Sequence, residues 1–96
     1  MNPQAHIIIS GKVQGVFYRA STRDKALRIG VTGWVKNIPG GNVEAVFQGE
    51  KNKVMQMIEW CKKGPAYSKV DDVSVTWEEL KEEFETFEVR YGWTEF

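Results

Sequence analysis

Arg19 is the side chain of this chain best suited to bind a phosphate group, because its planar guanidinium presents paired N–H donors that match phosphate oxygens. It ends the segment 11–19, which reads Gly-Lys-Val-Gln-Gly-Val-Phe-Tyr-Arg. Gly11 and Gly15 can adopt backbone conformations that other residues avoid, so consecutive N–H groups of this segment can turn inward around an anion. The alternative is an ordinary glycine-bearing turn with a solvated arginine, since short glycine motifs often match by chance.

The expected neighbours of this segment also favour an anion site. Residues 5–13 contain three consecutive isoleucines, apolar on both faces as in a central strand, and they predict the first strand. A helix is predicted from about residue 20 to residue 29, and Gly30 ends it in a left-handed conformation. The first N–H groups of a helix lack intrahelical partners and lie at the positive end of the helix dipole, so they attract anions.

Asn37 is the second candidate for chemistry. It ends a predicted strand over residues 31–37 and directly precedes the turn Ile-Pro-Gly-Gly. An asparagine in that position commonly bonds the backbone of the turn, but its carbonyl oxygen can instead hold a water molecule. Both interpretations remain open from position alone. In an antiparallel pair of strands next to the first strand, Asn37 would lie beside the segment 11–19.

The remaining elements predict a ferredoxin-like fold. A strand over residues 43–49 forms a hairpin with the second strand, and further strands are predicted over residues 69–78 and 87–91. The order β-α-β-β-α-β with a short fifth strand is typical of the split βαβ sandwich, an α+β fold with two helices on one face of an antiparallel sheet. The second helix is the clearest signal, with one complete apolar stripe formed by Val54, Met57, Ile58 and Cys61.

Composition and charge narrow the classes of function. The 96 residues have room for one hydrophobic core, so we expect one domain over residues 1–96. The 13 basic and 13 acidic side chains cancel, so no excess positive charge indicates a nucleic-acid partner. No apolar run approaches the ~20 residues of a membrane span, and the lone cysteine cannot form an internal disulfide. We therefore expect a cytoplasmic protein with neither a membrane nor a nucleic-acid partner.

The sequence offers no metal site and no convincing nucleophile. His6 is the only histidine and lies far in sequence from any carboxylate or cysteine partner, so we interpret it as a structural or surface residue. The glutamates between residues 78 and 88 are expected to lie on a solvated surface. A phosphate-binding segment without a metal, nucleophile or general base suits a substrate that is already reactive and needs mainly positioning and charge neutralisation.

The segment 11–19 is followed by residues 29–37, which read Ile-Gly-Val-Thr-Gly-Trp-Val-Lys-Asn, and together they resemble the acylphosphatase family. The resemblance implies hydrolysis of a carboxyl-phosphate mixed anhydride to a carboxylate and inorganic phosphate, without a metal or cofactor. Arg19 resembles the family's phosphate-binding catalytic arginine, and Asn37 resembles the asparagine that orients the attacking water. The implied phosphate-binding loop uses the backbone N–H groups of Gln14, Gly15, Val16, Phe17, Tyr18 and Arg19.

The resemblance further implies a small-molecule acyl phosphate as substrate, with inorganic phosphate as product and inhibitor, and we expect a monomer. Three alternatives remain: a non-catalytic module that binds phosphate or acyl phosphate, an RNA-binding ferredoxin-like module, and a domain of a larger maturation enzyme. RNA binding needs stacking aromatics with basic neighbours, and the third strand offers only Phe47 and an acidic Glu44. The length of 96 residues favours a free-standing protein. Residues 92–96 extend past the family's usual end and either pack against the domain or contact a second subunit.

Overall fold

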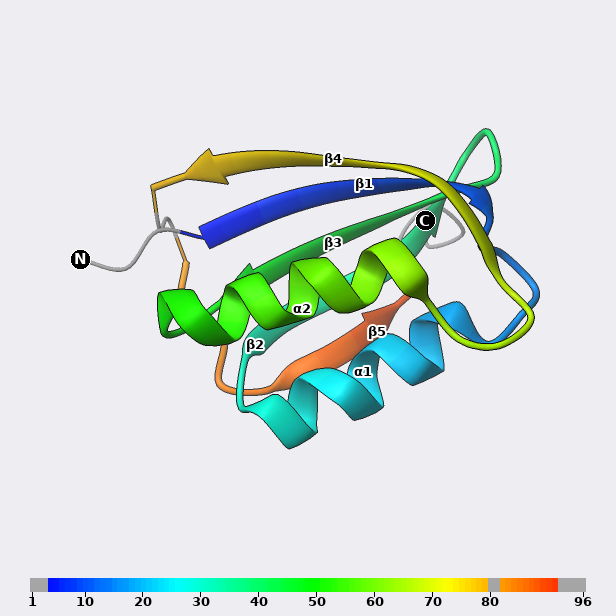
Figure 1. Ribbon diagram of the computed structural model, residues 1–96. Coiled ribbons are helices and arrows are strands. Elements are labelled where there is room, and N and C mark those ends of the chain that lie inside the picture. The colour runs from blue at the N-terminus through cyan, green and yellow to red at the C-terminus, as the bar shows by residue number, and fades with distance from the viewer. Residues whose placement is uncertain (1–3, 80–81, 92–96) are drawn as a thin grey trace.

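The computed structural model describes residues 4–79 and 82–91, so the extension over residues 92–96 lies outside the described residues. Within them, five strands and two helices follow one another in the predicted order. Both helices cover the same face of the sheet (Figure 1), and the predicted α+β ferredoxin-like fold is confirmed. The elements are β1 (Gln4–Lys12), α1 (Tyr18–Ile29), β2 (Thr32–Ile38), β3 (Asn42–Gln48), α2 (Lys51–Lys63), β4 (Lys69–Glu78) and β5 (Phe87–Arg90).

The strands lie in the order β4-β1-β3-β2-β5. The first four pair antiparallel, as predicted, but β5 pairs parallel with β2, so the sheet is mixed rather than wholly antiparallel. The direction of β5 follows from where β4 ends. Glu78 pairs with Gln4 at the end of the sheet where β2 begins, so the chain crosses that end and enters beside β2 in the same direction.

Gln48 holds this crossing connection against the sheet. Its Nε2 donates to Gln4 Oε1 at 2.9 Å and to the carbonyl of Glu82, and its Oε1 accepts from the Phe84 N–H at 3.1 Å. Gln48 is itself buried, so these bonds satisfy polar atoms that would otherwise be costly to bury. The glutamates of the connection, Glu82, Glu83 and Glu85, are exposed, as expected for the acidic run.

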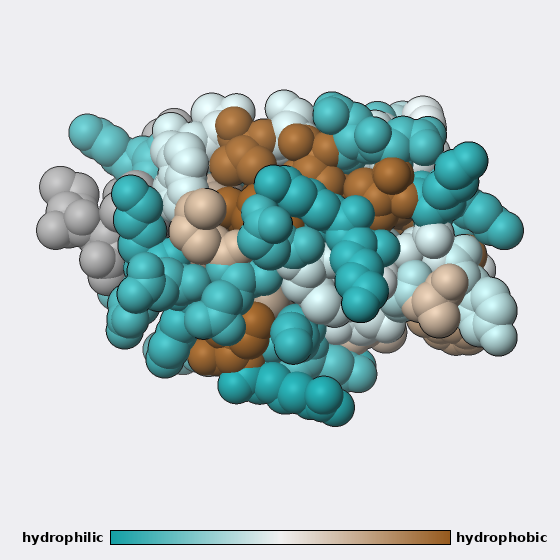
Figure 2. Space-filling model, in the orientation of Figure 1, coloured by the Kyte–Doolittle hydropathy of each residue, from teal (hydrophilic) through white to brown (hydrophobic). Residues whose placement is uncertain are grey.

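The hydrophobic core lies between the sheet and the two helices. Val43, Ala45 and Phe47 alternate along β3, are fully buried and belong to one hydrophobic cluster with residues of both helices. The predicted apolar stripe of α2 is confirmed, because all four of its residues are buried. Hydrophilic residues cover most of the helix-bearing face, with hydrophobic residues gathered in patches (Figure 2). The core therefore holds the helices firmly on the sheet.

Helix α1 begins two residues earlier than expected, at Tyr18 rather than residue 20. This start puts Arg19 in the first helical turn and leaves residues 13–17 as the connection from β1. Tyr18, Thr22 and Ala26 form the buried face of the helix. Among the described residues, no helix is long and apolar enough to cross a membrane.

Candidate active site

The N-terminus of α1 has the properties of an anion-binding helix end. Phe17 is the N-cap residue, with a left-handed backbone (φ 62°) and no hydrogen bond from its side chain to the helix. The Ser21 N–H donates to the Phe17 carbonyl at 3.0 Å, so the N–H groups ahead of Ser21 precede the intrahelical bonds. The first turn of α1 carries no acidic side chain. The positive end of the helix dipole is therefore not offset by the helix itself.

The backbone of Phe17 is strained without a packing reason. A left-handed conformation is uncommon for a bulky residue, and such strain often marks a functional turn. The Phe17 side chain is 81% exposed, so burial of the ring does not stabilise this conformation. The left-handed backbone of Phe17 therefore shapes the turn that precedes Tyr18. The Phe17 ring itself is exposed to solvent and lines the cavity described below.

The two glycines of the segment 11–19 have different tasks. A Cβ on Gly11 would lie 2.2 Å from the Lys69 carbonyl oxygen, so Gly11 permits close approach of β1 to β4 at a bulge. Gly15 also has a positive φ, of 75°, but a Cβ there would meet no heavy atom within 4 Å. Gly15 is therefore needed for its backbone conformation, and the space above it is open. Of the two glycines, only Gly15 lines the cavity described below.

A cavity of about 290 Å³ opens at this turn. Two arginines, Arg19 and Arg23, line it from successive turns of α1, and none of its lining residues is acidic. Its other walls are apolar or aromatic, and they come from the turn, from α1 and from β5. The remaining lining residues are Val13, Gly15, Phe17, Tyr18, Ala20, Val89 and Tyr91.

Arg19 lies against an aromatic ring that also lines this cavity. Its Cζ atom lies 4.7 Å from the centroid of the Tyr91 ring, a cation–π distance. Tyr91 directly follows β5, so the contact joins the start of α1 to the far edge of the sheet. A guanidinium held in this way loses less conformational freedom when it binds an anion.

Tyr18 anchors the turn from the inside. Its ring is buried, and its hydroxyl donates to the Cys61 carbonyl on α2 at 2.7 Å. Burial raises the pKa of the Tyr18 phenol well above its usual range, so the hydroxyl stays a neutral donor. Burial likewise raises the pKa of the Cys61 thiol to about 12. The Tyr18 side chain is thus structural, and the residue can serve an anion only through its backbone N–H.

Asn37 lies near the end of β2, on the face of the sheet that the helices cover and at the end of the sheet where the turn before α1 begins. Val35 is fully buried on that face, and Asn37 is the next residue with the same orientation. Val35 pairs with Val89 and Lys36 with Arg90, so Asn37 lies level with Tyr91. Asn37 Oδ1 is buried and has no hydrogen-bond partner among residues 4–79 and 82–91. A buried acceptor without a partner is unusual, and it leaves the carbonyl oxygen available to a water molecule or ligand.

Gln14 connects the turn to the hairpin that carries Asn37. Its Nε2 donates to the Ile38 carbonyl at 2.9 Å and to the Asn42 carbonyl at 2.7 Å. Ile38 and Asn42 are partners in the last pair of the β2–β3 ladder. The sequence predicted a backbone role for Gln14, and its side-chain bonds were missed because they depend on the packing of segments that lie apart in the chain.

His6 lies on the other face of the sheet and has partners that the sequence did not reveal. Its Nε2 is 2.5 Å from Glu44 Oε2, and its Nδ1 is 3.5 Å from Glu78 Oε2. These carboxylates are far from His6 in sequence, but β3 and β4 flank β1. In the part of the chain that the structure describes, no three His, Cys, Asp or Glu side chains gather as a metal site.

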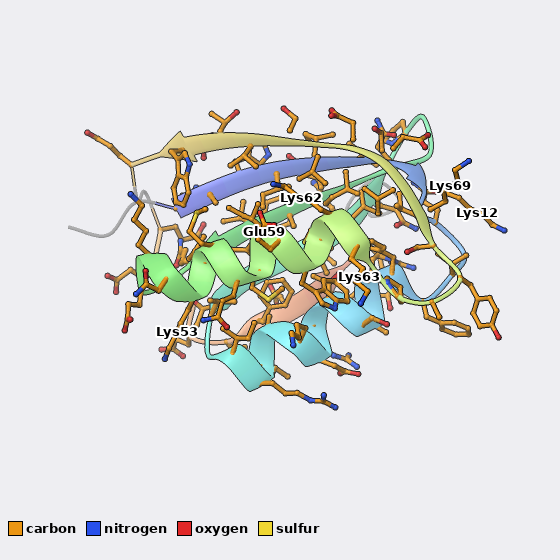
Figure 3. The ribbon with its side chains drawn as sticks, in the orientation of Figure 1. Lys12, Lys53, Glu59, Lys62, Lys63 and Lys69 are labelled. Atoms are coloured by element: carbon orange, nitrogen blue, oxygen red, sulfur yellow. The ribbon has the colours of Figure 1, made fainter. Side chains whose placement is uncertain are left out.

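Lysines project from the ends of β1 and β4 and from α2 (Figure 3), and none of them lines the cavity. Lys12 and Lys69 pair across β1 and β4 at the end of the sheet where the turn begins. On α2, Lys62 pairs with Glu59 at 2.8 Å and points to solvent. The positive charge that lines the cavity therefore comes from Arg19 and Arg23.

The sequence profile of the Acylphosphatase family matches residues 5–89. The chain belongs to the acylphosphatase family. It is 48% identical over 89 residues to an acylphosphatase of Syntrophobacter fumaroxidans, with 93% of this chain and 92% of the relative covered. The fold matches the solved acylphosphatase of Coxiella burnetii with a TM-score of 0.86, at 43% identity and 93% coverage of both chains. It matches that of Bacillus subtilis with a TM-score of 0.89, at 37% identity, covering 93% of this chain and 99% of the other.

The structure brings most of the predicted site residues to one end of this acylphosphatase-family fold. Gly15, Phe17, Tyr18 and Arg19 line the cavity. Val16 is half-buried against the core, and Gln14 reaches toward the hairpin, so neither side chain lines it. Arg23 and Tyr91 were not predicted. Arg23 lies four residues after Arg19. Had the helix been predicted to start at Tyr18, the two arginines would have been expected one turn apart on the same face of the helix. For Tyr91 the sequence gives no such signal.

Proposed function

We propose that the chain hydrolyses acyl phosphates, with Arg19 and the turn at residues 14–19 binding the phosphoryl group and Asn37 orienting the attacking water. One observation carries this proposal most directly. Arg19 stands in the first turn of a helix without acidic residues and lines a small cavity together with Arg23. A phosphoryl group there would meet backbone N–H donors, the helix dipole and the Arg19 guanidinium, with the positive charge of Arg23 one helical turn away.

The reaction is an in-line displacement at phosphorus. The water oxygen forms a bond to phosphorus while the bond from phosphorus to the acyl oxygen breaks, and the electron pair leaves with the carboxylate. A carboxylate is a stable leaving group, so it needs no proton from the protein. The proton of the attacking water passes to a phosphoryl oxygen of the substrate. The protein contributes position and charge, which are the main sources of catalysis in phosphoryl transfer.

Arg19 and the N–H groups of the turn stabilise charge on the phosphoryl oxygens. These donors are held in place before substrate binds, by the Tyr91 ring on one side and the Tyr18 anchor on the other. Preorganised donors cost no rearrangement at the moment of reaction, and loss of one typically lowers kcat by about 10²–10³-fold. Inorganic phosphate, which resembles the bound group, is expected to be both product and competitive inhibitor.

Asn37 supplies the direction of attack. Its unpartnered, buried Oδ1 accepts a hydrogen bond from a water molecule placed opposite the leaving carboxylate. An amide oxygen is not a useful base, so its contribution is orientation rather than proton removal. The turn interpretation of Asn37 is disfavoured for this atom, because a turn-capping oxygen would accept from a nearby backbone N–H.

The open face of the sheet disfavours the RNA-binding alternative. Such modules stack bases on aromatic side chains of the central strands. Here the open face of the central strands β1 and β3 carries the contact between His6 and Glu44. We expect a monomer, since the cavity is formed within one chain, and a cytoplasmic location, since Cys61 is a free thiol.

Steady-state hydrolysis of benzoyl phosphate in the presence of a chelator tests the proposal. We expect turnover by the parent chain, competitive inhibition by inorganic phosphate, and a loss of about 10²–10³-fold in kcat for Arg19→Ala. Arg28→Ala is the matched control, because Arg28 lies on the same helix in its last, exposed turn and should leave kcat unchanged. Binding of phosphate without turnover by the parent chain would favour the non-catalytic module instead.

A further inference from the structure

We propose that the Gln14 side chain is a positioning residue that sets the placement of Asn37 relative to the phosphate-binding turn. This inference rests on the proposed function, since it concerns how two parts of that site are held in register. Gln14 directly precedes Gly15, and both protons of its amide are directed at the hairpin that carries Asn37. It acts through Asn37 and the turn rather than on the substrate.

The two halves of the site lie on strands that are not neighbours. The turn extends β1 and Asn37 ends β2, while β3 lies between these strands. Two strand spacings separate them, roughly 10 Å. Hydrogen bonding within the sheet connects the halves only through β3. The Gln14 side chain bridges this gap at the end of the sheet, beyond the last pair of β1 with β3.

The point of attachment is the base of the β2–β3 hairpin. The Ile38 carbonyl, 2.9 Å from Gln14 Nε2, belongs to the residue that follows Asn37. The Asn42 carbonyl, 2.7 Å from the same nitrogen, belongs to the opposite strand of the hairpin. One amide group thus binds both strands at their last pair, which prevents the end of β2 from shifting relative to β3.

The tip of this hairpin has little packing of its own. Gly40 and Gly41 both have positive φ values, and a Cβ on either would meet no heavy atom within 4 Å. Loop tips of this kind are mobile on short timescales unless they are bonded at their base. Without Gln14, the strand end that carries Asn37 would be free to move by a fraction of an ångström or more. Displacements of about 1 Å are enough to lower catalysis by about 10²-fold.

The donors of Gln14 are occupied, so the side chain is not a phosphate ligand. Both N–H bonds go to main-chain carbonyls, and the amide oxygen would repel a phosphoryl oxygen. The expected consequence of losing Gln14 is therefore specific. Binding of phosphate by the turn should persist, while the placement of water by Asn37 should suffer.

A double-mutant cycle on benzoyl phosphate hydrolysis separates this role from a general structural one. The four proteins are the parent chain, Gln14→Met, Asn37→Ala and the double variant. We expect Gln14→Met to lower kcat by about tenfold in the parent background but by less than about twofold when Asn37 is already absent. The inhibition constant for inorganic phosphate should change by less than about threefold in Gln14→Met.

Gln48→Met is the matched control. Gln48 is a buried glutamine that also donates to two acceptors, but it lies at the other end of β3. It should lower the free energy of unfolding and leave kcat unchanged. Gln14→Ala serves as the second variant, because its short side chain leaves room for water at the two carbonyls, so we expect the fold to be preserved. It should show the same coupling to Asn37.

Equal falls in kcat with and without Asn37 would overturn the inference, as would a loss of phosphate binding as large as the loss of kcat. An unchanged kcat in both Gln14 variants would also overturn it. Failure of the proposed function has a different signature, since the parent chain itself would then show no turnover.

Discussion

Arg19 and Tyr91 contact each other in the wall of the cavity, with the guanidinium carbon 4.7 Å from the centre of the ring. Arg19 stands in the first turn of α1, and Tyr91 follows the edge strand β5. The contact therefore joins the N-terminus of α1 to the end of the strand that flanks β2. The aromatic contact restricts the orientations that the Arg19 side chain can adopt.

Removing the Tyr91 ring should weaken phosphate binding. We expect Tyr91→Leu to raise the inhibition constant for inorganic phosphate about two- to fivefold, the range of a cation–π contact at a partly exposed site. Tyr91→Phe keeps the ring and should stay within about twofold of the parent. Competitive inhibition assays measure both. If the Phe and Leu variants weaken binding equally, the ring face is not what holds Arg19.

Arg23 should contribute charge rather than a direct catalytic contact. It lines the cavity one turn after Arg19, but its side chain is 44% exposed and lies 3.6 Å from Asp24. Arg23→Gln is therefore expected to lower kcat/KM by about two- to fivefold, with a smaller effect at high salt because exposed charges are screened. Arg28→Gln, on the same helix, should have no effect. A loss of 100-fold at Arg23 would mean that it contacts the phosphoryl group directly.

Two glycine substitutions should differ sharply in their effect on stability. Gly15→Ala introduces a side chain at φ 75° into open space, so it should cost about 1–2 kcal/mol of free energy of unfolding. Gly33→Ala places a Cβ 1.9 Å from the Val46 carbonyl oxygen, inside the β2–β3 ladder, and should cost more than about 3 kcal/mol. Denaturant titration measures both losses. Comparable losses at the two positions would contradict the assignment of Gly15 to an open turn.

Burial of Cys61 predicts a dependence of stability on alkaline pH. The pKa of its thiol is raised to about 12 in the folded protein, above the ordinary value of 9.0. The unfolded chain therefore loses this proton first, so stability is fully present below pH 9 and decreases between pH 9 and pH 12. In Cys61→Ala the decrease over that range should be smaller. Chemical denaturation at a series of pH values tests this, and identical slopes for the two proteins would refute it.

Local sequence patterns were sufficient for the elements and for most of the turn. The strand predicted over residues 69–78 matches β4 at both ends, and the apolar stripe of α2 matches its buried face. Both are local properties, since periodicity within a few turns decides which side chains are buried. Arg19 and Gly15 were predictable for the same reason, because the motif, the strand before it and the helix after it are adjacent in the chain.

The contacts that complete the site depend on register between distant segments. Gln14 bonds the Ile38 and Asn42 carbonyls only because β3 places the hairpin beside the turn. Tyr91 reaches Arg19 because β5 runs parallel to β2, which the sequence did not predict. One residue of slip in either pairing would turn these side chains to the other face. Such pairings are set by the whole sheet, so local pattern could not reveal them.

Hydrolysis of benzoyl phosphate in heavy-oxygen water tests the central claim most directly. If the turn holds the phosphoryl group and Asn37 directs water at phosphorus, a single turnover by the parent chain places the label in inorganic phosphate and none in benzoate. Arg19→Ala should abolish most of this labelled phosphate. Label in benzoate would show that water attacks the acyl carbon, and it would contradict the proposed roles of Arg19 and Asn37.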